Sequence, residues 1–259
     1  MYPLTHAETG ESNLLKILNQ GLIPSHYLAQ ETTYRRSLKA YVSDYLIQEV
    51  FQEGLTRNLQ SFTRFFDALG HCQRELINYT NIARDCGVDA KTVREYFYIL
   101  EDTLIGSMLY PYSKRASREI ITQMPKFYLF DVGVAGYLAR RMAPEEKGEQ
   151  FGRAFEQFIH MELQAYNHYA DKDLDIRYWR TKAGQEVDFV LGDEVGIEAK
   201  GTDLVKSADL KGMAAFMDEC RPRRGIVVCN EKEPRRCGSI SVMPWRLFLN
   251  ELWSGKIVT

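Results

Sequence analysis

The chain has 259 residues, of which 45% are hydrophobic and 26% charged, and its formal net charge at pH 7 is −2. This composition is ordinary for a globular protein and excludes a uniformly basic nucleic-acid coat, so any contact with DNA or RNA must use a local patch. The length exceeds a single comfortable core of roughly 150 residues and therefore predicts two domains.

Several protein classes are disfavoured by what the chain lacks. Its cysteines are odd in number and form no CxxC pair, which favours reduced thiols over a disulfide framework or a zinc ribbon: Cys72, Cys86, Cys220, Cys229 and Cys237. No cleavable leader and no run of ~18 apolar residues is present, so we expect a cytoplasmic protein without a membrane partner. No Walker A loop occurs, because Gly255-Lys256 lacks the required upstream glycine spacing, and ATP hydrolysis is not expected of this chain.

The first part of the chain reads as helical. Residues 1–33 are too short to hold a core, and we interpret them as the tail of a missing upstream, ATPase-like domain. Residues 34–141 form the predicted helical domain. Its first helices carry an apolar stripe at helical spacing that is broken at Gly54: Leu38, Tyr41, Val42, Tyr45, Leu46, Val50, Phe62, Phe65, Phe66 and Leu69.

Residues 76–130 contain a helix-turn-helix pattern. A short helix around Ile82 is followed by a turn at Gly87, a cap at Asp89 and a second helix over 90–100. This second helix places Val93, Phe97 and Leu100 inward and leaves Lys91, Thr92, Arg94 and Glu95 outward. Strands over 104–109 and 126–130, separated by a basic loop over 113–118, favour a winged form.

The charge of this segment leaves its function open. Between Arg74 and Lys126 there are eight Lys or Arg and seven Asp or Glu, so the segment supplies little of the phosphate attraction that dominates DNA affinity. If the second helix reads DNA, Lys91 and Arg94 are its nucleic-acid-binding residues. The alternative is a winged helix used for protein contacts or domain docking.

Residues 142–150 are polar, lack periodicity and predict a linker, and residues 151–259 form the second predicted domain. A helix over 151–169 precedes strands over 176–179, 186–191 and 195–200, a helix over 207–220 and a strand over 225–229. On that helix we interpret His160 and His168 as surface or packing residues.

Charged residues inside these strands indicate chemistry. Glu198 and Lys200 are two residues apart and share a strand face, and Asp188 can face the same side from the preceding strand. Buried charges are costly unless they are paired or bind a metal. Hard carboxylate oxygens suit Mg²⁺ or Mn²⁺, and a lysine beside them can stabilise developing phosphate charge. The alternatives are a surface ion pair on an edge strand and a nuclease fold that has lost its activity.

Asp188 followed by Glu198-Ala199-Lys200 resembles the PD-(D/E)xK nuclease signature, with Val187 in place of the eponymous proline. Glu156 resembles that superfamily's additional helix acid. Residues 155–159, 178–190 and 197–200 resemble the domain of unknown function 4143, which usually lies C-terminal to an AAA ATPase core, and residues 126–133 and 34–46 resemble its N-terminal half. Gly21-Leu-Ile-Pro24 resembles the last segment of that ATPase.

The resemblance implies an α+β protein with a helical, winged-helix-like domain followed by an α/β restriction-endonuclease-like domain. It implies metal binding by Glu156, Asp188 and Glu198, and catalysis by Asp188, Glu198 and Lys200. Arginines late in the chain would track phosphate beside this site, or form a solvated face: Arg221, Arg223, Arg224, Arg235 and Arg236.

Three functions are compatible with this reading of the sequence. The first is processing or binding of nucleic acid, including Mg²⁺-dependent phosphodiester hydrolysis. The second is an inactive nuclease-fold module that regulates or targets an ATPase domain, upstream or in trans. The third is a DNA-binding regulator that acts through residues 89–100.

Overall fold

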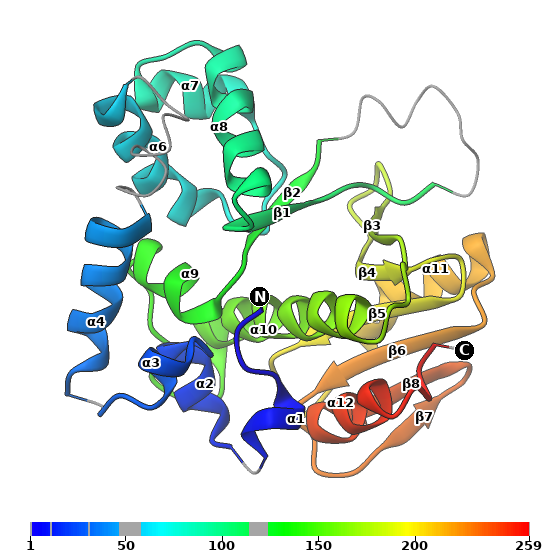
Figure 1. Ribbon diagram of the computed structural model, residues 1–259. Coiled ribbons are helices and arrows are strands. Elements are labelled where there is room, and N and C mark those ends of the chain that lie inside the picture. The colour runs from blue at the N-terminus through cyan, green and yellow to red at the C-terminus, as the bar shows by residue number, and fades with distance from the viewer. Residues whose placement is uncertain (1, 11, 31, 47–57, 114–123, 259) are drawn as a thin grey trace. The chain divides into compact units, whose positions relative to one another are not determined.

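A computed structural model of the chain describes residues 2–10, 12–30, 32–46, 58–113 and 124–258 (Figure 1). The chain forms two compact units. Unit 1 comprises residues 1–4, 12–108 and 124–143, and unit 2 comprises residues 5–11, 109–123 and 144–259. The protein is thus a mixed α and β structure, with helices dominating unit 1 and a sheet in unit 2.

Unit 1 consists of helices and one two-stranded sheet, β1–β2. Its elements are α2 (Leu14–Gln20), α3 (Pro24–Tyr27), α4 (Tyr34–Ala40), the π-helix η1 (Tyr41–Leu46), α6 (Leu59–Cys72), α7 (Tyr79–Cys86), α8 (Ala90–Asp102), β1 (Gly106–Leu109), β2 (Lys126–Leu129) and α9 (Val132–Leu138). The predicted break at Gly54 lies outside the described residues.

The predicted helix pair in unit 1 is confirmed. Gly87 adopts φ 69° after α7, and the Asp89 carboxylate accepts a hydrogen bond from Thr92 N at 2.7 Å, which caps α8. Val93, Phe97 and Leu100 are fully buried. Helices α6, α7 and α8 therefore share an aromatic core with the small sheet. The winged form stays a prediction, because residues 114–123 of the basic loop lie outside the described residues.

Residues 12–33 belong to unit 1, so the predicted boundary at residue 34 is wrong. Asp131, fully buried at the start of α9, accepts hydrogen bonds from Leu22 N at 2.7 Å and Val134 N at 2.9 Å. A Cβ added at Gly21 would lie 2.1 Å from Asp131 Oδ1, so only glycine allows this contact. The buried carboxylate ties the turn that precedes α3 to α9, which makes this stretch an integral part of the helical core.

Unit 2 is built on a mixed six-stranded sheet in the order β3-β4-β5-β6-β8-β7. Its elements are α1 (His6–Thr9), α10 (Gly148–Tyr169), β3 (Ile176–Arg180), β4 (Glu186–Leu191), β5 (Val195–Lys200), the 3₁₀ helix η3 (Ser207–Leu210), α11 (Lys211–Cys220), β6 (Arg224–Cys229), β7 (Arg235–Cys237), β8 (Ile240–Pro244) and α12 (Trp245–Trp253). Strands β3, β4 and β5 are antiparallel, whereas β5, β6 and β8 are parallel.

Helices α10 and α12 cover one face of this sheet and α11 covers the other (Figure 1). The α11 side is closely packed because a Cβ at Gly196 would lie 2.7 Å from Phe216, and a Cβ at Gly225 would lie 2.7 Å from Met217. On the α10 side, a Cβ at Gly201 would lie 2.7 Å from the Cα of Gly152. These approaches fix α10 beside the end of β5, where the predicted site lies.

The strands predicted over 186–191 and 195–200 have the bounds of β4 and β5. The predicted linker is shorter than expected, because α10 begins at Gly148, three residues before the predicted start. Strands β7 and β8 and helix α12 were not predicted.

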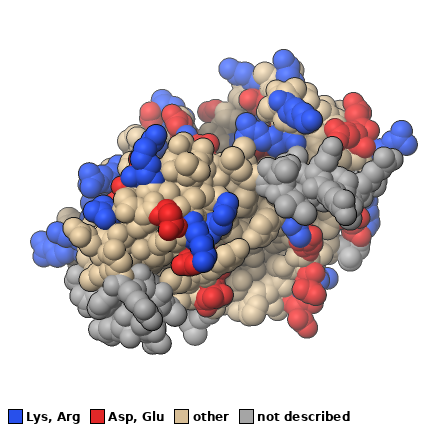
Figure 2. Space-filling view, turned by 90° about the horizontal axis from the view of Figure 1, so that it is seen from above, with Lys and Arg blue, Asp and Glu red and all other residues tan. Residues whose placement is uncertain are grey.

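The surface of the chain carries charges of both signs. On the face that Figure 2 shows, Lys and Arg side chains are interspersed with Asp and Glu side chains. No helix within the described ranges has the length and apolar character needed to cross a membrane. The cysteines are free thiols, and Cys86, Cys220 and Cys229 are buried.

Candidate functional site

The hairpin of β4 and β5 brings Asp188, Glu198 and Lys200 together at the end of β5. The ladder pairs Phe189 with Ile197, and beyond that pair the Asp188 carboxylate accepts a hydrogen bond from Ala199 N at 2.8 Å. The Asp188 side chain therefore reaches the backbone of β5 between Glu198 and Lys200. Two carboxylates and one ammonium group converge here from adjacent strands, as the alternation of the sequence predicts.

Glu198 and Lys200 form a short ion pair. Lys200 Nζ lies 2.6 Å from Glu198 Oε1, and the exposed fractions of the side chains are 34% and 7%, respectively. Asp188 and Glu198 are both buried residues. The predicted alternative of a solvent-exposed ion pair does not describe this geometry, because β5 is an interior strand and the carboxylate is removed from water.

The electrostatics of this pair follow from burial and from neighbouring charges. Burial raises the pKa of Glu198, and the positive charge of Lys200 opposes that increase. Burial alone would lower the pKa of Lys200, but the charges of Glu198 and Asp188 outweigh it and raise its pKa above the usual range. Lys200 is thus held as a cation. The second oxygen of Glu198, Oε2, is buried and accepts no hydrogen bond from the part of the chain that the structure describes.

Glu156 approaches the same carboxylate from α10. It is half-buried one turn beyond Gly152, and its charge raises the pKa of Glu198. Among the described residues, no three His, Cys, Asp or Glu side chains are arranged so that they could hold a metal ion. The structure therefore brings Asp188, Glu198 and Lys200 together, and Glu156 acts on Glu198 through its charge. Metal binding by the three acids stays a prediction.

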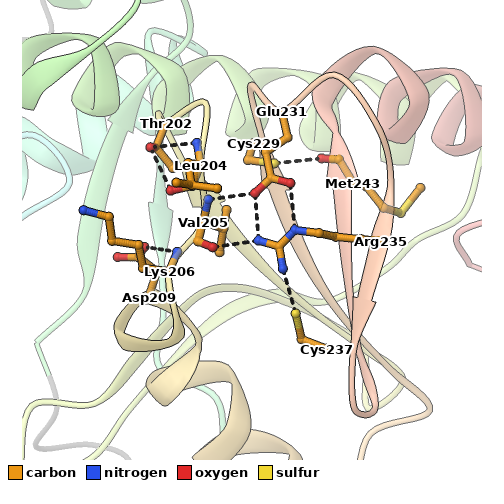
Figure 3. A network of polar contacts seen from close by, with 10 residues as sticks. All are labelled: Thr202, Leu204, Val205, Lys206, Asp209, Cys229, Glu231, Arg235, Cys237 and Met243. Atoms are coloured by element: carbon orange, nitrogen blue, oxygen red, sulfur yellow. Dashed lines mark hydrogen bonds and ion pairs between the residues drawn. The ribbon is translucent and has the colours of Figure 1, made fainter.

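A polar network holds the loop that follows Lys200 (Figure 3). The Glu231 carboxylate accepts a hydrogen bond from Val205 N at 2.7 Å and binds the Arg235 guanidinium through both oxygens, at 2.8 Å each. Arg235 also donates to Val205 O at 2.6 Å, and Asn230 N donates to Thr202 O at 2.8 Å. The loops after β5 and β6 are thereby joined, which fixes the end of β5 that carries Lys200.

The arginines at the start of β6 do not lie beside the acids. The parallel register pairs Val195 with Arg224 and Lys200 with Cys229. Arg224 is therefore five residues, about 16 Å, along the strands from the level of Lys200. Arg221 and Arg223 precede it, so these three arginines lie toward the opposite end of the strands from Lys200. Phosphate tracking by the predicted cluster stays a prediction.

Those arginines also have local partners. Arg224 Nη1 donates to Lys256 O at 2.8 Å, and Arg223 lies 4.0 Å from Glu194. The sequence groups Arg235 with the same basic cluster. In the structure Arg235 is the first residue of β7 and binds Glu231, which follows the carboxyl end of β6. Arginines that are close in the sequence were therefore predicted to form one cluster, but the fold separates them.

The predicted reader-helix residues are solvent-exposed on unit 1. Lys91 lies 4.0 Å from Glu95, one turn further along α8, and both side chains are more than half exposed. The Arg94 guanidinium lies over the ring of Tyr79, 4.9 Å from its centroid. The prediction that they point outward is confirmed, and their binding of nucleic acid stays a prediction.

Two buried groups on α10 add to the polar interior of unit 2. His160 is a packing residue, as one of its two interpretations expects: its ring lies 5.7 Å from that of Phe189, and burial lowers its pKa to about 3. Glu162 accepts hydrogen bonds from His6 N at 2.7 Å and from Trp253 Nε1 at 2.8 Å. No role was predicted for Glu162, although its spacing from Phe158 and Ile159 places it on the buried face of α10.

Two family models match the chain. The domain of unknown function DUF8612 matches residues 11–145, which is more than half of the chain, and the domain of unknown function DUF4143 matches residues 151–248. The junction between these matches falls within a few residues of the boundary between unit 1 and unit 2. Neither the curated proteins nor the solved structures contain a match to this chain.

Proposed function

The chain belongs to the DUF8612 family, which is defined without a known activity, and from that premise we propose that unit 2 processes nucleic acid by metal-dependent phosphodiester hydrolysis. The observation that carries the proposal is the ion pair of Glu198 and Lys200 on an interior strand, beside the buried carboxylate of Asp188. Hydrophobic residues of similar volume would stabilise such a position as well or better, so the charges favour a chemical role.

The donor atoms fit a hard divalent cation. Asp188 and Glu198 offer carboxylate oxygens, and the buried Glu198 Oε2 accepts no hydrogen bond from any described residue. Glu156 lies near enough for its charge to act on Glu198. Mg²⁺ or Mn²⁺ held by Glu156, Asp188 and Glu198 would polarise a phosphoryl oxygen and lower the pKa of a bound water.

Lys200 is the cation that the chain itself provides at this site, in addition to the proposed metal ion. Its side chain is one-third exposed while that of its carboxylate partner is buried, so Lys200 is the member of the pair that an incoming substrate can reach. A fixed cation beside the phosphorus stabilises the charge that develops on the non-bridging oxygens as the bond to the leaving oxygen breaks. The Glu231–Arg235 network holds the following loop and so limits the movement of this residue.

Hydrolysis of labelled single-stranded DNA, duplex DNA and RNA by the purified chain tests the proposal. Wild type should cleave at least one substrate with Mg²⁺ or Mn²⁺ and none with EDTA. Asp188→Asn should lower the rate by about 10²-fold or more, as loss of a key electrostatic group does. Asp193→Asn, at the exposed tip of the same hairpin, is the matched control and should cleave normally. Equal cleavage by wild type and Asp188→Asn would reveal a contaminating nuclease.

A second function is supported by a different feature of the same site. Lys200 already occupies Glu198 Oε1, and no three-residue metal group is formed by the described side chains. A nuclease fold used as a non-catalytic module that regulates or targets an ATPase domain would have these properties. It predicts wild-type cleavage no higher than the EDTA background, together with unchanged folding of Asp188→Asn.

A further inference from the structure

Helices α2, α4 and α9 of unit 1 and the residues after α9 line a pocket of about 290 Å³, and its lining includes none of the residues discussed for nucleic-acid processing. Its lining contains Arg35, Arg140 and Arg141, two tyrosines and an asparagine, and no Asp or Glu. From this lining we propose that the pocket binds a small phosphate-bearing ligand, recognised through a pyrophosphoryl group.

The three guanidinium groups have no carboxylate partner among the residues that the structure describes. Within the described part of the chain, none of them forms an ion pair, and Arg35 instead donates to the thioether of Met142 and to Tyr34 Oη. Three cations on one small cavity repel each other, and an anion between them relieves that repulsion. Guanidinium groups also match phosphate oxygens with paired N–H donors, which makes arginine the residue suited to this ligand.

The wall that carries the arginines is fixed by hydrogen bonds. The Asn19 side chain donates to Ala143 O and accepts from Ala143 N, each at 2.9 Å, which holds the segment after α9 against α2. At the end of α9, Arg141 N donates to Gly136 O at 2.9 Å. The pocket is therefore largely pre-formed, so little ordering would oppose binding.

The backbone at Arg140 is unusual for an arginine. Its φ is 52°, in the left-handed region where glycine is favoured at the end of a helix. A helix C-terminus stabilises cations in general, which would explain the basic residues there without any ligand. That purely structural role predicts no binding of polyanions. Titration with a polyphosphate ligand therefore distinguishes the structural role of the arginines from a role in binding.

The ligand must be compact. The cavity is at the lower limit of small-molecule sites, and the side chains of Tyr34, Tyr137 and Leu38 give it a partly apolar wall. Inorganic pyrophosphate and ADP share the proposed group and differ in the nucleoside. Equal affinity for both would assign recognition to the phosphates alone, and tighter binding of ADP would assign a nucleotide that also contacts the tyrosines.

Calorimetric titration of the full chain with pyrophosphate and with ADP, in EDTA and at constant ionic strength, tests the proposal. Wild type should bind one equivalent, and Arg141→Ala should weaken binding about 10-fold to 100-fold, the loss expected for charge-assisted hydrogen bonds. Arg141→Lys keeps the charge but loses the paired donors and should give an intermediate affinity. Because Arg141 is half-buried, Arg35→Ala on α4 provides a second variant should the first fail to fold.

Arg36→Ala is the matched control, because Arg36 is exposed on the same helix as Arg35 and does not line the pocket. It should bind like wild type. Absence of binding by wild type, or an equal loss in Arg36→Ala and Arg141→Ala, would overturn the proposal. Asp188→Asn should bind normally, so failure of this pocket and failure of the proposed hydrolysis are distinguishable.

Discussion

The end of β5 in unit 2 and the outer face of α8 in unit 1 both carry charges suited to nucleic acid, but their charges have different surroundings. Glu198 is buried and its partner Lys200 is only one-third exposed, at a separation of 2.6 Å. On α8, Lys91 is 86% exposed and lies 4.0 Å from Glu95. Solvated pairs of the second kind contribute little and occur on any helix, whereas a buried pair needs a compensating reason. Function is therefore better sought at β5.

Removing Lys200 gives the largest expected effect. Lys200→Met should lower the rate of hydrolysis by about 10²–10³-fold, because the cation beside the phosphorus is lost. It should also destabilise unit 2, because Glu198 is left buried without its partner. The cost should be at most about 3 kcal/mol, at the lower end for buried pairs, because Lys200 is partly exposed and Glu198 can take up a proton.

The double variant Lys200→Met, Glu198→Gln separates these two effects. With neither charge of the pair left, denaturant unfolding should show stability recovered toward that of wild type, while the rate of hydrolysis stays at least as low as in Lys200→Met. Full activity in Lys200→Met would contradict the catalytic role. An unchanged stability in both variants would show that the pair at β5 behaves like the solvated pair on α8.

A second buried carboxylate predicts a pH dependence that surface charges cannot give. Burial raises the pKa of Glu162 from 4.5 to about 7, although its hydrogen bonds from Trp253 and His6 oppose the increase. The stabilisation from its proton is complete below pH 4.5, where folded and unfolded chains are both protonated, and is lost as the pH rises through 7. At about 1.4 kcal/mol per pKa unit, the loss is about 3 kcal/mol.

Urea unfolding between pH 4.5 and 8.5 measures this loss. Glu162→Gln should remove about 3 kcal/mol of the decline in stability above pH 5, because position 162 can no longer ionise. Any decline that remains belongs to other buried acids such as Glu198, whose pKa burial also raises. Glu219→Gln, an exposed acid on α11, should follow the wild-type curve. Parallel curves for wild type and Glu162→Gln would contradict the prediction.

The network of Figure 3 should have a smaller effect on stability and a visible effect on the site. Glu231→Ala removes the acceptor of Val205 N, which should cost about 1–3 kcal/mol, and it also removes the partner of Arg235. Amide hydrogen exchange should increase in residues 201–206, next to Lys200. Glu233→Ala, an exposed change in the same loop, is the control and should alter neither quantity.

The sequence predicted the strands of the site because their alternation is local. Asp188, Glu198 and Lys200 share a face by period two, and a hairpin turn at Gly192 sets the register between their strands. Asp89 and Gly87 likewise mark a helix cap and a left-handed turn by residue type alone. Where neighbouring residues determine the structure, the sequence was sufficient.

Long-range pairing was the part that the sequence could not supply. Strand β7 has three residues and gains its structure from β8, and β6 pairs with β8 across an intervening connection. The same limit placed Arg221 and Arg235 in one cluster, although the parallel register puts Arg224 and Lys200 at opposite ends of the sheet. Which carboxylate oxygen of Glu198 binds Lys200 depends on side-chain packing. The alternation of residues along the strand cannot predict it.

The smallest expected effect concerns the outer face of α8. If that face contacts DNA, binding should be weak and non-specific, because Glu95 neutralises part of its charge. The charge reversals Lys91→Glu and Arg94→Glu should then each flatten the plot of log affinity against log salt by about 1, the slope of one phosphate contact.

Fluorescence anisotropy with two unrelated duplexes, between 25 and 200 mM salt, distinguishes the possible roles of α8. Arg84→Glu is the control, since this exposed arginine on α7 lies 3.8 Å from Asp85 and outside the predicted reader helix. Wild type should bind both duplexes alike and lose binding as salt rises, because only phosphate attraction is available. Preference for one duplex would require base contacts from α8. It would make α8, and not the end of β5, the better-supported nucleic-acid site. A wild type that binds neither duplex at the lowest salt would assign the helix pair to contacts with protein, leaving unit 2 as the only candidate nucleic-acid site among the described residues.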